Sequence, residues 1–321
     1  MESYIFKTSC DTLGLFQKSG GSCSIYLGKD FFPVTESVSW DEWIDYCGEA
    51  SSRPLPQSTL NDPISSAVSF FVWKYGDRVS PDIVDMKKSV LPAGDYYIRT
   101  NWNSFGLFET VRRHHSTIDE IRSYNNLTSA LSDIFNVVEP DVRNREVYGH
   151  RIRELLTISC SEVEYLFLQV LKDNGYFSPR YSTNDYVKIL PLLKLNEYRA
   201  ELYMHPAMGT FSPFKDWNTQ KPTESLSWYS SYNAAKHDRG GNFHQATLGA
   251  VINAISAVHI LLEAQYGHRL FESPLYSTYE SCFQTVERPT WDCCEMVSPY
   301  INESQELVWN NARKYFDDSP V

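Results

Sequence analysis

Apolar residues recur at steps of three and four positions through residues 150–176, the spacing that places side chains on one face of an α-helix. The members of this face are Ile152, Leu156, Cys160, Val163, Phe167 and Val170. Gly175 follows Asp173 and Asn174, a combination that ends helices. The pattern therefore predicts a long amphipathic helix.

A second stretch, residues 246–267, is apolar nearly all round. Amide, imidazole and carboxylate side chains interrupt it at Asn253, His259, Glu263 and Gln265. Its length approaches the roughly 20 residues that cross a bilayer, but these polar groups make it a poor membrane span. A helix of this kind is typical of the centre of a bundle. We expect a core helix that ends at Gly267, in a protein without a membrane segment.

Shorter helices are predicted around these two. Residues 182–195 begin with a Ser/Thr/Asn/Asp cluster suited to capping. Residues 221–239 start with Pro222 near a helix entrance, and residues 122–149 indicate a helix followed by a connector around Pro140. Together these patterns predict an all-α helical bundle over residues 145–270.

The flanking regions have different patterns. Short runs of aromatic and β-branched residues at 22–32, 67–76 and 94–108 predict strands, and residues 39–50 predict a helix capped by Ser39. Residues 1–140 therefore form a smaller mixed α/β domain of unknown role. Residues 271–321 read as an irregular C-terminal extension with one more helix after Glu303, and the overall class is α+β.

Length and charge narrow the function. The 321 residues suit two domains, and a net charge of -11 argues against a broad nucleic-acid surface, so any polyanion site is local. The seven cysteines are odd in number and form no C-x-x-C pair, which favours reduced thiols. The N-terminus lacks the features of a signal peptide, which predicts the cytosol. No residue cluster has metal-ligand spacing, so neither metal nor cofactor is expected.

The segment 231–251 concentrates the candidate chemistry and allows two interpretations. In the first, Lys236, His237 and Arg239 are cations in the last turn of a helix, where they complement its dipole. Gly240 and the glycine that follows it then supply left-handed backbone for leaving the helix. This interpretation needs no function.

In the second interpretation the segment is a catalytic site. Asn233 and His237 are four residues apart, and Tyr229 is one turn earlier, so an amide, an imidazole and a phenol face one way. Arg239 and His244 have an R-x4-H spacing at the entrance of the apolar helix. An arginine fork, an imidazole and a helix N-terminus together suit a phosphodiester.

The helices over residues 150–171 and 231–261 resemble those of the HEPN superfamily, whose members include toxins and phage-defence ribonucleases. Arg239 and His244, in the sequence "RGGNFH", match its R-x4-6-H motif. The resemblance implies an all-α domain that cleaves RNA without a metal. It also implies a homodimer with a composite site, and an antitoxin or defence-system partner protein.

Two features keep alternatives open. Gly240 stands where the family usually has a polar residue, which favours a catalytically silent dimerisation or nucleotide-binding module that acts as a scaffold or regulator. The neighbouring "YNAAKHDR" resembles a second signature and offers His237 as a rival to His244.

If the protein is a ribonuclease, it cleaves RNA by attack of the ribose 2′-OH on the adjacent phosphate, and each candidate residue has a role in this reaction. His244 or His237 acts as general acid or base, and Arg239 stabilises the phosphorane oxygens. The remaining candidates bind or orient the substrate: Asn233, Lys236, Tyr229 and, in a minor role, Arg153.

Overall fold

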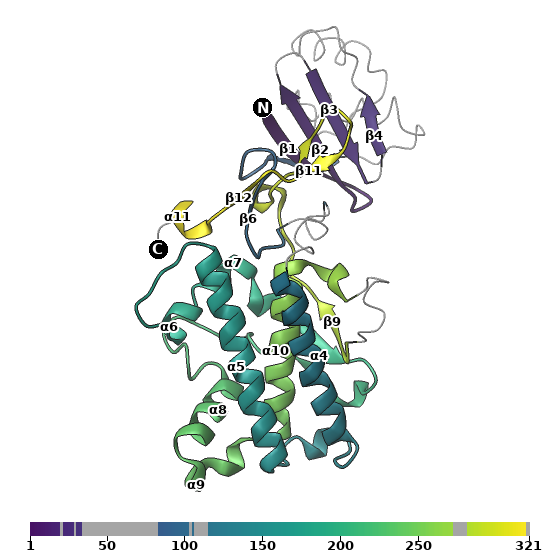
Figure 1. The fold of residues 1–321 in the computed structure, drawn as a ribbon. Coiled ribbons are helices and arrows are strands. Elements are labelled where there is room, and N and C mark those ends of the chain that lie inside the picture. Colours follow the sequence, from purple (N-terminus) through teal and green to yellow (C-terminus); the bar gives the residue numbers. More distant parts are fainter. Residues whose placement is uncertain are drawn as a thin grey trace. The chain divides into compact units, whose positions relative to one another are not determined.

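The computed structural model describes residues 1–19, 22–28, 30–33, 83–102, 105, 115–271 and 281–318, and Figure 1 shows their fold. The helix predicted over residues 39–50 and the strand predicted over 67–76 lie outside these ranges. The chain divides into two compact units. The first takes its described residues from Met1–Tyr96, Trp102–Leu107 and Trp291–Arg313, and the second from Tyr97–Asn101, Phe108–Thr290 and Lys314–Val321.

The first unit is built on a five-stranded antiparallel sheet in the order β4-β3-β2-β1-β5. Its strands are β1 (Glu2–Thr8), β2 (Leu13–Ser19), β3 (Ser22–Leu27), β4 (Asp30–Pro33) and β5 (Ile83–Lys88). Apolar side chains of the first three strands form its core: Ile5, Phe6, Leu15, Phe16 and Ile25. The strand predicted over residues 22–32 is thus two strands, with Gly28 in a left-handed conformation (φ 63°) between them.

A late segment of the chain completes this unit. The buried amide of Gln17 donates to the hydroxyl of Ser3 and to the carbonyl of Pro299, and it accepts from the backbone N–H of Ile301. The elements of this unit outside the main sheet are β6 (Asp95–Tyr97), η7 (Cys293–Glu295), β10 (Tyr300–Ile301), β11 (Leu307–Val308) and β12 (Asn311–Arg313). β10 pairs with β11, and β12 pairs with β6. The sequence after Glu303 was expected to be helical, but it forms β11 and β12 before the four-residue α11 (Tyr315–Asp318).

The second unit is organised around α10 (Leu248–Tyr266), whose side chains are almost all buried. Thr247 caps its N-terminus by accepting from the N–H of Ala250, and Gly267 ends it at φ 90°. α4 (His115–Phe135), α5 (His150–Asp173) and α8 (Ser227–His237) pack against it, as Figure 1 shows for α4 and α5. α10 is long and apolar enough to cross a membrane, but 89% of its most apolar window is buried inside the protein. The core helices predicted over residues 150–176 and 246–267 are therefore confirmed.

The predicted all-α bundle over residues 145–270 is wrong. β7 (Arg199–Leu202) and β8 (Thr210–Phe211) lie within that range and form a three-stranded antiparallel sheet with β9 (Phe283–Glu287), in the order β8-β7-β9. All three strands contact α10. β7 shows the alternating burial of a strand, but over only four residues. Its partner β9 is distant in sequence, so the helical pattern of the neighbours hid it.

Short helices connect the long ones in the second unit: η1 (Val142–Asn144), α6 (Thr183–Tyr186), α7 (Ile189–Leu193), η2 (Leu195–Glu197), η3 (Pro206–Met208), α9 (Arg239–Asn242), η4 (Phe243–Gln245) and η5 (His268–Leu270). The single helix predicted over residues 182–195 is α6 and α7 followed by η2. The helix predicted over 221–239 begins only at Ser227, as α8.

A buried arginine joins three of the long helices. Arg99, in a left-handed conformation (φ 56°), donates to Glu120 of α4, to Asp173 of α5 and to Gln265 of α10. Burial opposes its charge, but the hydrogen bond to Glu120 and the charges around it outweigh burial and raise the pKa of Arg99. Arg99 thereby fixes the start of α4 and the ends of α5 and α10 relative to one another.

Candidate functional site

The segment expected to be catalytic folds as a chain of short turns. α8 ends at His237, α9 begins at Arg239, and η4 carries His244 to the start of α10. Gly240 and Gly241 lie inside α9, and neither has a positive φ. The expectation that they provide a left-handed exit is therefore wrong. The carboxylate of Asp238 instead accepts from the N–H of Gly241 and turns the chain.

The residues expected to converge on one face of α8 have different surroundings. Tyr229 is buried and donates to Glu164 of α5 at 2.7 Å, and burial together with this bond raises its pKa. Lys236 is exposed and donates to the hydroxyl of Tyr232 at 2.9 Å, which raises the pKa of Lys236. Tyr229 is thus a packing residue between α8 and α5.

The other predicted residues are distributed as follows. His237 is exposed at the end of α8, and Asn233 is half-buried on the same helix. Arg153 is half-buried on α5, and its Nε has no hydrogen-bond partner in the described part of the chain. The backbone of Arg239 begins α9, while its side chain lies outside what the structure describes.

His244 lines a pocket of about 410 Å³, which we call the His244 pocket. Its polar lining comes from the chain before α5, the first turn of α8, η4 and the start of α10: Arg145, Glu146, Ser227, Ser231, His244, Gln245, Thr247 and Asn253. His244 was a predicted site residue, whereas Arg145 and Glu146 were not. Those two residues lie about a hundred positions away, and only the fold brings them to this pocket.

Arg145 lines this pocket, while its guanidinium contacts two residues outside the pocket lining. One of its terminal nitrogens donates to the carbonyl of Met208, and the group lies over the ring of Phe211, with Cζ 5.1 Å from the ring centroid. Its Nε has no hydrogen-bond partner among the described residues, although it is buried. A donor of this kind is costly to bury unless something accepts from it.

One helix N-terminus borders the His244 pocket. α8 begins at Ser227, and no described side chain caps it, a situation in which first-turn N–H groups can donate to an anion. The start of α10 differs, because Leu248 and Gly249 donate to the carbonyls of Val147 and Arg145. The sequence favoured the entrance of α10 for anion binding, whereas the structure favours that of α8.

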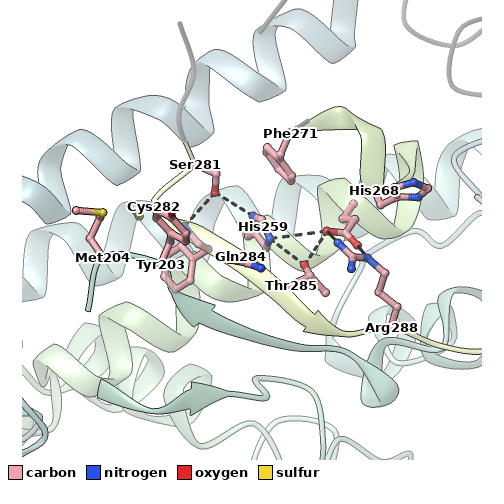
Figure 2. Close-up of a pocket in the computed structure, with 12 residues that line it drawn as sticks. Tyr203, Met204, His259, His268, Phe271, Ser281, Cys282, Gln284, Thr285 and Arg288 are labelled. Carbon is pink, nitrogen blue, oxygen red and sulfur yellow. Dashed lines mark hydrogen bonds and ion pairs between the residues drawn. The ribbon is translucent and has the colours of Figure 1, made fainter. Parts of the chain in front are cut away.

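A larger cavity of about 600 Å³ lies farther along α10, where α10 and β9 both line it (Figure 2). We call it the His259 cavity. α10 contributes His259 and Glu263, and β9 contributes Phe283, Gln284 and Thr285. The signal for this cavity in the sequence is the i,i+4 pair of polar residues, His259 and Glu263, on an otherwise apolar helix.

The polar side chains of the His259 cavity form one connected chain. Thr285 donates its hydroxyl to Glu263 at 2.6 Å, so the same hydroxyl accepts from Nε2 of His259 at 3.0 Å. The other ring nitrogen, Nδ1, is then an acceptor, 3.2 Å from the Tyr124 hydroxyl and 3.3 Å from the Ser281 hydroxyl. The Glu263 carboxylate can only accept a hydrogen bond, so Thr285 must donate to it, and His259 therefore carries its proton on Nε2.

Burial and the nearby cation Arg288 lower the pKa of His259 to about 3. The imidazole is therefore neutral across the physiological range. Arg288 also pairs with Glu263 at 2.5 Å, so the two formal charges beside His259 cancel. The ring of His259 is stacked on Phe271, with centroids 4.5 Å apart.

In the described residues, no group of three or more His, Cys, Asp or Glu side chains is arranged to hold a metal ion. No protein-family model, curated protein or solved structure matches this chain.

Proposed function

We propose that this chain cleaves RNA at the His244 pocket. The observation that carries the proposal is that a histidine (His244), an arginine (Arg145) and a glutamate (Glu146) line one polar pocket beside the start of α8, which has no side-chain cap among the described residues. A base, an acid and donors for a negatively charged oxygen are the groups that phosphodiester cleavage needs.

The proposed reaction is attack of the ribose 2′-oxygen on the adjacent phosphorus. The Glu146 carboxylate takes the proton of the 2′-OH as the new P–O bond forms. The bond from phosphorus to the 5′-oxygen then breaks, and His244 gives that oxygen a proton. The products are a 2′,3′-cyclic phosphate and a 5′-hydroxyl. Arg145 and the N–H groups of α8 stabilise the charge on the phosphorane oxygens.

This assignment changes the roles expected from the sequence. Arg145 takes the place in the pocket that the motif gave to Arg239, and His244 is favoured over His237 because it lines the pocket. Arg239 stays a candidate for the phosphate because it begins α9, next to η4. The HEPN resemblance adds a homodimer with a composite site and an antitoxin or defence partner to the proposal. We also propose a cytosolic location.

The test is cleavage of a labelled single-stranded RNA in EDTA and, separately, in Mg²⁺. The variants are His244→Ala, Glu146→Gln, Arg145→Lys and Arg239→Ala, each checked for folding by circular dichroism. His237→Ala is the control, because it removes an exposed histidine outside the pocket. We expect wild type and His237→Ala to yield cyclic phosphate ends. His244→Ala should lose at least a hundredfold in rate, within the range for a general acid.

Cleavage that is undiminished in His244→Ala and Glu146→Gln would contradict the proposal. Binding of RNA without cleavage, weakened by Arg145→Lys, would support the silent nucleotide-binding module instead. Loss of cleavage in His237→Ala alone would return the assignment to the rival histidine.

A further inference from the structure

The His259 cavity is separate from the His244 pocket, and its walls combine aromatic faces with a few fixed polar groups. Phe271 and Phe283 line it together with Tyr203 and Met204, which are 63% and 72% exposed. A volume of about 600 Å³ is typical of sites for small organic ligands, which are mostly apolar and have few polar anchors. Exposed apolar side chains at the rim of a cavity are available to cover a ligand.

The side-chain amide of Gln284 is exposed at this cavity and has no hydrogen-bond partner among the described residues (Figure 2). An amide presents one donor and one acceptor side by side. Such a pair matches the edge of a planar heterocycle, as in the recognition of adenine by Asn and Gln. The Gln284 amide can therefore pair with a ligand edge that carries one acceptor and one donor next to each other.

The inner wall of the cavity holds its polar groups rigidly. Ser281 contacts His259 and Tyr124, and it also accepts from the N–H of Phe283 at 3.1 Å. Each of these partners is itself buried, so the Ser281 hydroxyl has a fixed place. A rigid polar group favours a ligand whose own polar atoms are rigid, because neither side loses conformational freedom on binding.

The charges of the cavity favour a neutral ligand. Among the described residues that line it, only Glu263 and Arg288 carry a formal charge, apart from histidines, and they pair with each other. His259 stays neutral because its pKa is low. Burial also raises the pKa of the Cys282 thiol to about 12, so this side chain stays protonated. A phosphate or an ammonium group would find no unpaired opposite charge there among these groups.

Binding explains the cavity better than catalysis does. The contact of Ser281 with His259 has the arrangement of a nucleophile and its base. An imidazole with a pKa of about 3 is, however, a weak base at neutral pH. His259 therefore acts as a positioning residue that orients Ser281 and Thr285.

From these observations we propose that the His259 cavity binds a neutral, planar nitrogen heterocycle of nucleoside size. The base lies among Tyr203, Met204 and Phe271, and Gln284 bonds its edge. The ligand is a free nucleoside or an unstacked base of an RNA strand, because both present the same ring. This site is independent of RNA cleavage at the His244 pocket.

The test uses the full chain and adenosine, guanosine, cytidine and uridine in saturation-transfer NMR. A short single-stranded RNA is a separate arm that distinguishes a base in a strand from a free nucleoside. We expect saturable binding of at least one probe. Gln284→Trp, which fills the cavity from an exposed position, and Tyr203→Ala should each weaken it at least tenfold. Phe177→Ala is the matched control, because Phe177 is an exposed aromatic residue of the same unit outside the cavity.

Binding by nucleosides or by RNA alone, with this dependence on Gln284 and Tyr203, supports the proposal and identifies the source of the ring. Absence of binding in every arm would overturn it, as would binding that Gln284→Trp leaves unchanged. Gln284→Ala replaces Gln284→Trp if the latter fails to fold. His244→Ala should keep nucleoside binding intact, so this proposal can fail or succeed independently of RNA cleavage.

Discussion

At the scale of single residues, the buried polar groups of the second unit are the most informative feature. Arg99 and Glu120 are both almost fully buried and hold each other at 2.8 Å, while Glu263 is matched by Thr285 and Arg288. Buried charges persist only when they are paired and hydrogen-bonded. These residues therefore show where the unit depends on one specific arrangement of side chains.

Removing Arg99 should be strongly destabilising. Arg99→Met leaves the Glu120 carboxylate buried without its cation, a change that typically costs about 3–5 kcal/mol in the free energy of unfolding. Arg122→Met is the matched control, because Arg122 forms an exposed ion pair with Asp119 on α4, the helix that carries Glu120. This substitution should change the free energy of unfolding by less than about 1 kcal/mol. Urea titrations followed by circular dichroism measure both. Equal losses of unfolding free energy in the two variants would contradict the role of Arg99 in joining α4, α5 and α10.

The low pKa of His259 makes stability depend on pH. Between about pH 6.5, its ordinary value, and about pH 3, the unfolded chain binds a proton at this residue and the folded chain does not. The stability that the neutral His259 contributes to the folded state is therefore lost as the pH falls through this window, by roughly 1 kcal/mol for each pH unit. The His259→Gln variant should not lose stability in this way, because glutamine does not bind a proton in this pH range.

The stability advantage of wild type over His259→Gln should accordingly shrink between pH 6 and pH 4. Urea titrations at a series of pH values measure it, and His237→Gln controls for the loss of an exposed histidine. An advantage that is constant over this range would show that His259 takes up a proton in the folded state as readily as in the unfolded one.

At the scale of elements, α10 shows that the residues next to a helix determine where it begins and ends. Gly267 ends the helix as predicted, and the structure adds Thr247 as its N-terminal cap, a role that suits this residue type. Gly175 likewise follows the end of α5 with φ 86°. The sheet β8-β7-β9 was not predicted, because its short strands gain stability from partners that lie far along the chain.

The cap of α10 can be tested by itself. Thr247→Ala removes the hydroxyl that accepts from Ala250, and it should lower the free energy of unfolding by about 1 kcal/mol. Thr247→Ser keeps the hydroxyl and should lose less than half as much. Thermal or urea unfolding of both variants provides the comparison. If Ser is no better than Ala, the cap is not the source of the effect.

At the scale of the whole molecule, a net charge of -11 limits how RNA can bind. The proposed pocket offers about two phosphate contacts, from Arg145 and from the region of His244 and α8. For a single strand this predicts a slope of about -1.4 in a plot of log affinity against log salt concentration. Fluorescence anisotropy with a labelled RNA gives this slope. A slope several times steeper would require a broad cationic surface and contradict a local site.

The sequence by itself determined the two core helices, because periodicity, caps and stops are properties of neighbouring residues. It also singled out His244, because a histidine beside an arginine and a helix entrance is visible locally. The tertiary structure alone decided that Arg145 and Glu146 join His244, and that a sheet lies against α10. The His259 cavity likewise combines α10 with β9. Packing brings these distant residues together, and no local pattern records it.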